Sequence, residues 1–85
     1  MKFKLTLESR AKKDIQSLDR VLQKRIAGKL KFFIDQDDPL QYAKKLTNAK
    51  DGDYRWRIGN FRVVFDVDGD VIKILRIQHR KDVYK

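Results

Sequence analysis

The sequence predicts an α+β domain in which two helices cover one face of an antiparallel sheet. Three observations support this prediction. The first residues alternate between apolar and polar, two stretches with helical periodicity follow, and the chain after residue 53 is typical of strands joined by two-residue turns. Because the helices and the sheet each have one apolar side, burying those sides against each other gives two layers.

The N-terminal half predicts a strand and a helical hairpin. Apolar and polar residues alternate over residues 2–7, as in a half-buried strand. Helical spacing begins at Ser9, a candidate N-cap, and continues to about Leu18. Asp19 is placed to cap a second helix, which Pro39 stops. The apolar stripe of this second helix consists of Leu22, Ile26, Leu30, Phe33 and Ile34.

The C-terminal half predicts a three-stranded antiparallel meander after a polar connection. Gly59-Asn60 and Asp68-Gly69 are two-residue hairpin signals between apolar runs. They place strands at residues 53–58, 61–67 and 70–78. The spacing DVDGD also occurs in calcium loops, but Ile77 stands where such a loop needs a bidentate glutamate, which favours the hairpin turn.

The first hairpin predicts a sheet with one apolar and one basic face. A two-residue loop fixes the register, so if Ile58 pairs with Phe61, Arg57 lies directly opposite Arg62, with Arg55 on the same face. The other face is the core side, which the helices cover. It carries Tyr54, Trp56, Ile58, Phe61, Val63, Phe65 and Val67.

Continued alternation in the last strand also places Lys73 and His79 on the arginine face. Like charges that face each other on a sheet repel, and folding does not require this pairing. One interpretation is that Asp66, Asp82 or the acidic run 35–38 neutralises the cluster in surface salt bridges. The other is an anion site, which we favour because planar guanidinium groups match phosphate oxygens.

The composition limits the classes of function. The 85 residues suffice for one small packed core, so we expect a single domain over residues 1–85. Without cysteine the chain has no disulfide, thiolate zinc site or thiol nucleophile. It contains no signal-peptide core and no apolar run near the roughly 20 residues that span a bilayer, so we expect a cytosolic protein. A formal charge of +9 favours a polyanionic or acidic partner.

The C-terminal tail concentrates further polar side chains. His79, Arg80, Lys81 and Tyr84 fall within six residues. A single histidine rules out a two-histidine acid–base pair and a histidine-rich metal site. Taken alone, His79 and Tyr84 have structural interpretations, as a strand-end histidine and a terminal core residue. If the protein is an enzyme, it works with arginine, lysine, histidine and tyrosine, without a metal or another cofactor.

The run YRWRIGNFRVVFDVDGDVIKILRIQHRKDVY resembles the C-terminal half of the RelE/ParE superfamily of toxin–antitoxin toxins. The shared pattern is a Tyr-x-x-Arg-x-Gly-x-Tyr/Phe-Arg-Val hairpin and a closing His-Arg-x-x-x-Tyr. The preceding strand, helical hairpin and Lys45-Leu46 also fit, so the resemblance spans nearly the whole chain and implies the same small α+β fold. The chain departs from the pattern at Gln78, often glycine, and at Thr47-Asn48, which replaces a glycine-bearing loop.

Within the superfamily the chain is more similar to the RelE branch. This resemblance implies a ribosome-dependent endoribonuclease that cuts messenger RNA in the A site without metal, by attack of a 2′-hydroxyl on its neighbouring phosphate. Positions that match the family carry Arg55, Arg57, Arg62, Arg80 and Tyr84. Of these, Arg57, Arg62, Arg80 and Tyr84 are the expected catalytic residues, with Tyr84 stacking on or bonding near a base. The expected RNA-binding residues are Arg55, Lys73, Lys45 and Lys81.

The general base is left open, because arginine stays protonated at neutral pH. Lys73, His79 and Lys45 are candidates, as is orientation of the 2′-hydroxyl by the ribosome, and we choose His79. Other functions also fit: a ParE-like inhibitor that binds DNA gyrase, an inactivated toxin or a basic RNA-binding module. In any toxin interpretation the inhibitor is an antitoxin on a separate chain, with an acidic or amphipathic segment.

Overall fold

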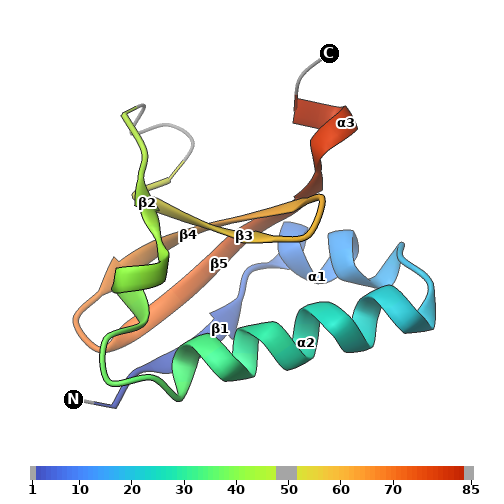
Figure 1. Ribbon diagram of the computed structural model, residues 1–85. Coiled ribbons are helices and arrows are strands. Elements are labelled where there is room, and N and C mark those ends of the chain that lie inside the picture. Colours follow the sequence, from blue (N-terminus) through green and yellow to red (C-terminus); the bar gives the residue numbers. More distant parts are fainter. Residues whose placement is uncertain (1, 48–51, 84–85) are drawn as a thin grey trace.

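The computed structural model describes residues 2–47 and 52–83, which form a five-stranded sheet with the two main helices on one face (Figure 1). The strand order is β1-β5-β4-β3-β2, with β1 parallel to β5 and the other neighbours antiparallel. The predicted α+β fold and its meander are therefore confirmed. The strands are β1 (Lys4–Leu7), β2 (Lys44–Lys45), β3 (Tyr54–Ile58), β4 (Phe61–Asp68) and β5 (Val71–His79).

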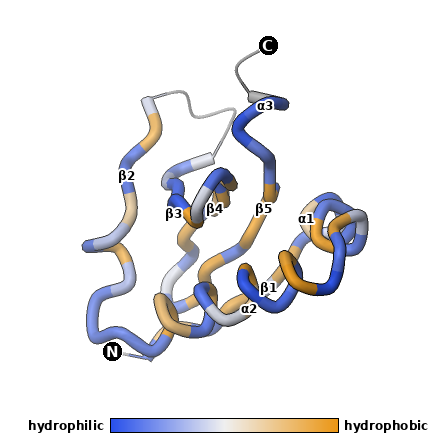
Figure 2. The backbone as a smooth tube through the Cα atoms, turned by 45° about the vertical axis from the view of Figure 1, so that its right-hand side comes forward, coloured by the Kyte–Doolittle hydropathy of each residue, from blue (hydrophilic) through white to orange (hydrophobic). Residues whose placement is uncertain are grey.

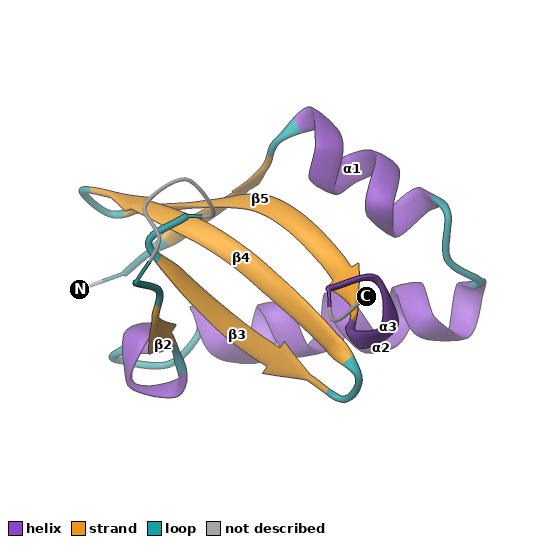
Figure 3. Cartoon of the chain, turned by 90° about the horizontal axis from the view of Figure 1, so that it is seen from above, coloured by secondary structure: helices purple, strands orange, loops and turns teal. Residues whose placement is uncertain are grey.

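The two main helices are α1 (Ser9–Gln16) and α2 (Arg20–Ile34), and Figure 3 shows both beside and below the sheet. Asp19 caps α2 as predicted, because its Oδ1 accepts the amide hydrogen of Leu22 at 2.9 Å. Ser9 is not an N-cap: it is the first helical residue, and the capping position belongs to Glu8, whose side chain makes no capping bond. None of the described helices is long and apolar enough to cross a membrane.

The core lies between α2 and the sheet. Trp56 is fully buried (0% exposed), its ring 4.8 Å from that of Phe33 on α2 and 4.2 Å from that of Phe65 on β4. Its indole N–H donates to the Pro39 carbonyl at 3.1 Å, so the one polar atom of the ring is satisfied. Apolar residues recur along β1, β5 and α2 in Figure 2, as burial of one face of each requires. The buried residues are Ala11, Ile26, Leu30, Phe33, Trp56, Ile58, Phe61, Val63, Phe65, Ile72, Ile74 and Ile77.

Part of the predicted polar connection has regular structure. A 3-10 helix, η1 (Pro39–Tyr42), follows α2, and the two-residue strand β2 pairs with β3. Asp38 begins η1 by accepting the amide hydrogen of Leu40 at 3.1 Å. Two residues of strand have no periodicity to detect, which is why the sequence did not predict β2. A short helix, α3 (Arg80–Val83), ends the described chain.

The turn between β4 and β5 differs from the predicted one. A two-residue turn at Asp68-Gly69, as predicted, would set Val67 opposite Asp70. Val67 instead pairs with Ile72, around a turn that contains Gly69 at φ 62°. Glycine adopts this left-handed conformation without steric cost. The register error equals two residues, so alternation is unchanged and Lys73 lies on the arginine face as predicted.

A β-bulge in β5 has a larger effect. The pairing with β4 shifts by one residue between Val64 and Phe65, which leaves Leu75 as an extra residue in β5. Beyond the bulge the alternation is inverted, and His79 pairs with Phe61 on the core side, with ring centroids 5.0 Å apart. The prediction that His79 lies on the arginine face is therefore wrong, because it assumed uninterrupted alternation.

Candidate functional site

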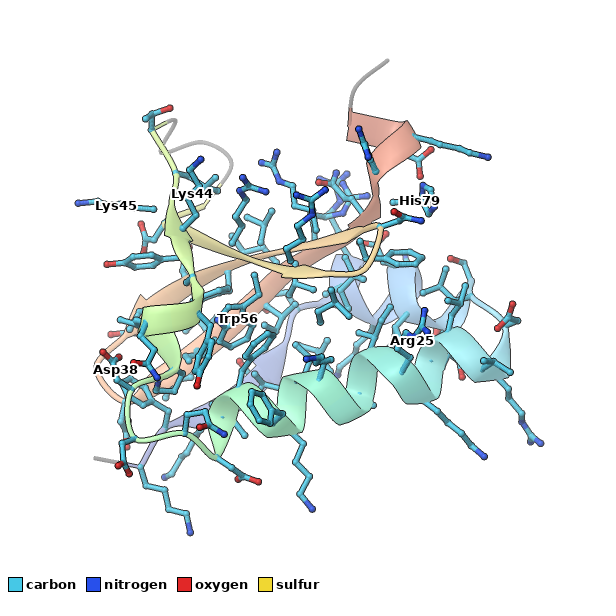
Figure 4. All side chains as sticks on the ribbon, in the orientation of Figure 1. Arg25, Asp38, Lys44, Lys45, Trp56 and His79 are labelled. Atoms are coloured by element: carbon cyan, nitrogen blue, oxygen red, sulfur yellow. The ribbon has the colours of Figure 1, made fainter. Side chains whose placement is uncertain are left out.

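Basic side chains gather on the face of the sheet opposite α2, which we call the basic face. Arg57 lies directly opposite Arg62 in the hairpin register, as predicted. Lys44 on β2 faces Arg55, and Arg76 on β5 reaches the same face because the bulge pairs it with Val64 on β4. Figure 4 shows side chains tipped with nitrogen above the sheet, between β2 and α3. The basic face consists of Lys44, Arg55, Arg57, Arg62 and Arg76.

The three hairpin arginines lack ion pairs with any carboxylate among the residues that the structure describes. The interpretation that Asp66, Asp82 or the run 35–38 neutralises them is therefore not supported in the described chain. Asp66, the carboxylate on the same face, instead accepts the Asp53 amide hydrogen at 2.9 Å. The mutual repulsion of Arg57 and Arg62 is left uncompensated by described side chains, as expected of an anion site.

A hollow of about 510 Å³ lies where β4 and β5 meet the beginning of α1, and we call it the α1 hollow. Arg62 is one of its cations, and the Nε atom of Arg62 is buried and has no hydrogen-bond partner within the described chain. A buried donor without a partner is costly in the free protein. The hollow is lined by Glu8, Ser9, Arg10, Arg62, Val64, Leu75, Arg76 and Gln78.

A second hollow, of about 240 Å³, lies on the other side of the hairpin arginines, beside η1. We call it the η1 hollow. Three of its side chains are cations of the basic face, and one is aromatic. Arg57 lines this hollow and faces Arg62, which lines the other, so the arginine pair separates the two. The lining residues are Gln41, Tyr42, Ala43, Lys44, Arg55 and Arg57.

Asp14 on α1 fixes the position of Arg76. Its carboxylate accepts from Arg76 Nε at 2.8 Å and Nη2 at 3.2 Å, and from the Ile77 amide at 2.9 Å. Burial raises the pKa of Asp14, but these hydrogen bonds and the positive charges of Arg76 and Arg10 outweigh it and hold the pKa below 3.8. The ion pair anchors one cation of the basic face to a helix.

The basic face is partly covered by the chain at Gly52. Val64 on this face is only 2% exposed because the chain at Gly52 lies over it. Gly52 has φ +126°, and a Cβ there would stand 2.5 Å from Val64 Cγ1 and 3.2 Å from Leu75 Cδ1. Only glycine fits this close approach. The basic face is therefore covered at Val64, whereas Arg57 and Lys44 are exposed.

The other predicted site residues lie in different parts of the sheet. Lys45 pairs with Tyr54 and points away from the basic face in Figure 4, whereas Lys44, which was not among the predicted site residues, takes the position beside Arg55. Lys73 is paired with Asp68 at 3.3 Å. The signal that separates Lys44 from Lys45 is strand parity, which a two-residue strand conceals.

The tail is placed close to the hairpin turn. The Arg80 amide donates to the Asn60 carbonyl at 2.7 Å, so α3 begins beside the turn between β3 and β4. Arg80 and Lys81 are exposed, and the Lys81 amide donates to His79 Nδ1 at 3.1 Å. Tyr84, a predicted catalytic residue, lies outside the described residues.

Comparison with known proteins agrees with the resemblance seen in the sequence. Residues 5–84 match the family model of the ParE toxin of the type II toxin–antitoxin system parDE. A stretch of 31 residues is 48% identical to Toxin RelE3 of Methanocaldococcus jannaschii, and it covers 36% of this chain but only 35% of that relative.

Two solved toxin–antitoxin complexes have a similar fold. The RelE–RelB complex from Pyrococcus horikoshii OT3 gives a TM-score of 0.72 at 28% identity, over 94% of this chain and 97% of the matched chain. The RelBE2 complex from Mycobacterium tuberculosis gives 0.70 at 25% identity, over 94% and 100%. The chain therefore belongs to the ParE toxin family of type II toxin–antitoxin systems, within the RelE/ParE superfamily.

Proposed function

We propose that the protein cleaves messenger RNA in the ribosomal A site without metal. In this reaction the 2′-oxygen bonds to the adjacent phosphorus while the bond from phosphorus to the 5′-oxygen breaks, leaving a 2′,3′-cyclic phosphate and a 5′-hydroxyl. The observation that carries the proposal is the Arg57–Arg62 pair, free of carboxylate partners within the described chain and adjoining a hollow with a buried, unpartnered guanidinium nitrogen.

Arg62 is proposed as the main clamp on the reacting phosphate, with Arg57 beside it. The pentavalent transition state carries more negative charge than the phosphodiester, so fixed cations stabilise it selectively. Arg76 would contribute from across the α1 hollow, held in place by Asp14. Arg80 begins beside the hairpin turn and is proposed to reach the same RNA. Tyr84 retains its proposed role at a base on sequence grounds alone.

The proton from the 2′-hydroxyl needs an acceptor, and the leaving 5′-oxygen needs a proton. Of the candidate bases, His79 and Lys45 lie off the basic face, and Lys73 is paired with Asp68. We therefore do not propose His79 as the base. The arrangement favours a mechanism in which this chain supplies positioning and charge while the ribosome orients the 2′-hydroxyl.

A cognate antitoxin on a separate chain is the proposed inhibitor, since the similar solved structures are toxin–antitoxin complexes. An acidic or amphipathic segment would cover the basic face of a protein with a formal charge of +9. We propose a cytoplasmic location, where ribosomes and messenger RNA are available.

The second candidate function is inhibition of DNA gyrase by binding. It is favoured by the family model, whose description is that of a ParE toxin. In that case the basic face would be a docking surface for protein, and no group on it would need to stabilise a phosphorane. The two functions predict different products, so one experiment separates them.

The test uses programmed ribosomes that carry end-labelled message, incubated with the purified protein with and without EDTA. Cuts confined to the A-site codon, unaffected by EDTA and ending in a cyclic phosphate, are expected. Arg62→Ala should slow cleavage by about 10²–10³-fold, the usual effect of losing one donor to a developing charge. Arg25→Ala is the matched control, because Arg25 is an exposed arginine on α2 (Figure 4).

Intact message with the parent protein, together with loss of gyrase supercoiling, would overturn the nuclease proposal in favour of gyrase. Equal cleavage by Arg62→Ala and the parent would remove the assignment of Arg62. Circular dichroism on each variant separates a lost site from a lost fold.

A further inference from the structure

The η1 hollow differs from the rest of the basic face because an aromatic side chain forms part of its wall. Tyr42 lines the hollow, and 43% of its surface is exposed. This exposure is notable because a tyrosine ring can be buried in a core rich in aromatic residues. Phe32 is similarly exposed at 45% and touches the same cluster, but it does not line the hollow. Exposure alone therefore does not distinguish Tyr42; its place among cations does.

The ring of Tyr42 is held by the core rather than by the ligand. Its centroid lies 5.6 Å from that of Phe33 and 5.8 Å from that of Phe32. Phe33 stacks in turn on the fully buried Trp56 at 4.8 Å. A ring fixed in this way loses little conformational freedom on binding, which favours recognition of a flat partner.

Three cations line the same hollow as Tyr42: Lys44, Arg55 and Arg57. None of them makes an ion pair with a carboxylate in the described parts of the chain. An aromatic platform beside a track of cations is the arrangement by which proteins bind single-stranded nucleic acid, where bases stack and phosphates meet the charges. A planar, anionic partner fits this chemistry better than an aliphatic peptide does.

We propose that the η1 hollow holds the base of one nucleotide of single-stranded RNA, stacked on Tyr42, beside the phosphate held by Arg57 and Arg62. The inference rests on the proposed nuclease function and adds the path of the bound strand across the sheet. Since Arg57 belongs to the η1 hollow and Arg62 to the α1 hollow, the RNA runs across the strands, from β5 over the arginine pair toward η1.

The test is a double-mutant cycle between Tyr42 and the RNA. Binding of a fluorescein-labelled single-stranded RNA is measured by anisotropy at low salt, with an intact strand and with strands lacking one base at each position in turn. Tyr42→Ala should weaken binding of the intact strand by about 5- to 100-fold, the usual effect of one lost base stack. Tyr42→Phe should bind within about twofold of the parent, because the ring and not the hydroxyl stacks.

The cycle assigns the effect to one base. One abasic position should weaken binding by the parent as much as Tyr42→Ala does, and should have little further effect on the Tyr42→Ala variant. Val21→Ala is the control: it removes an exposed apolar side chain of α2 that does not line the hollow, and it should leave binding and the abasic profile unchanged.

Several outcomes would overturn the inference: no measurable binding by the parent at low salt, no abasic position coupled to Tyr42, or equal losses in Tyr42→Ala and Val21→Ala. It would also fail if Tyr42→Ala weakened only antitoxin binding. Ribosome cleavage is scored separately. Cleavage on ribosomes without an abasic position coupled to Tyr42 would contradict this inference and leave the nuclease proposal standing. Coupling to Tyr42 without cleavage would support the RNA subsite and contradict the nuclease proposal. Tyr42→Phe and the abasic strands keep the test decisive if Tyr42→Ala is unstable.

Discussion

Arg57 and Arg62 are a pair that folding alone does not favour. They lie directly opposite each other on adjacent strands, and the described chain supplies neither with a carboxylate. Like charges at such positions destabilise a sheet by about 0.2–1 kcal/mol relative to neutral pairs. A residue pair that is unfavourable in the free protein and favourable beside a phosphate is consistent with a binding role.

Replacing one of these arginines should therefore make the protein more stable and less able to bind RNA. Arg57→Thr is expected to raise the free energy of unfolding by about 0.2–1 kcal/mol, measured by urea denaturation at low salt. The gain should vanish near 1 M salt, where screening acts within about 3 Å. A loss of stability at low salt would instead indicate that Arg57 has an anionic partner in the free protein.

For single residues, the sequence predicted the position of a side chain only where neighbouring residues determine the backbone geometry. The Gly59-Asn60 turn determined that Arg57 faces Arg62, since a two-residue loop sets the register. The role of Tyr42 could not be predicted, because its exposure depends on contacts with Phe33 across the core. Such contacts have no signature in the sequence near Tyr42.

At the scale of elements, α1 completes an edge of the sheet that β1 leaves uncovered. β1 ends at Leu7, which pairs with Ile74, and β5 continues beyond it. There Asp14 on α1 accepts the amide hydrogen of Ile77, in the place of a strand carbonyl. The same carboxylate binds Arg76, so one side chain covers the edge and orients a cation of the basic face.

The contacts of Asp14 with Arg76 and Ile77 should make the free energy of unfolding depend on pH in the acidic range. The pKa of Asp14 is lowered in the folded protein, so its contribution is complete above the unfolded value near 4 and is lost as the pH falls below it. Asp14→Asn should lower the free energy of unfolding at pH 7 by about 1.5–3 kcal/mol, as for a lost hydrogen bond to a charged group. The side chain is only 18% exposed, which limits solvent screening.

The measurement is urea denaturation of both proteins from pH 3 to pH 7. The difference between parent and Asp14→Asn should narrow progressively below about pH 4, because the parent loses the same charge by protonation. A difference that is as large at pH 3 as at pH 7 would show that the carboxylate charge of Asp14 is not what joins α1 to β5.

The bulge has a signal in the sequence that simple alternation overlooks. The buried isoleucines of β5 are Ile72, Ile74 and Ile77, so their spacing changes from two to three residues. A strand that buries one face keeps a period of two, and a step of three indicates an inserted residue. Alternation counted from Ile77 instead of Ile72 places His79 on the core side, where it lies against Phe61.

For the whole molecule, the positive charge that matters for the proposed function lies on one side of the sheet. The two hollows and the arginine pair between them present cations from β2, β3, β4 and β5. Association with RNA should therefore depend strongly on salt, because each phosphate contact releases bound counterions.

The two-layer fold was predictable from the sequence because apolar periodicity fixes which faces are buried. The partial cover of the basic face at Gly52 was not predictable.

The salt dependence of RNA binding measures how many phosphates the protein contacts. For single-stranded RNA, the logarithm of the binding constant should fall with the logarithm of salt by about 0.7 for each phosphate contact. Arg62→Ala is expected to reduce the slope by about 0.7, whereas Arg25→Ala on α2 should leave it unchanged. Equal slopes for the parent and Arg62→Ala, measured by anisotropy titration, would show that Arg62 does not contact phosphate.

The bulge at Leu75 also has a consequence for how this chain tolerates changes in length. The pairs beyond it, Arg62 with Gln78 and Phe61 with His79, are those that a strand one residue shorter would form in regular register. A deletion at this point would keep those pairs, because the strand already carries one residue more than the pairing uses. The same deletion within Ile77–His79 would exchange the inward and outward side chains of the tail. Removing the extra residue would therefore keep the strand pairing at Arg62 but would take away the Leu75 side chain that lines the α1 hollow.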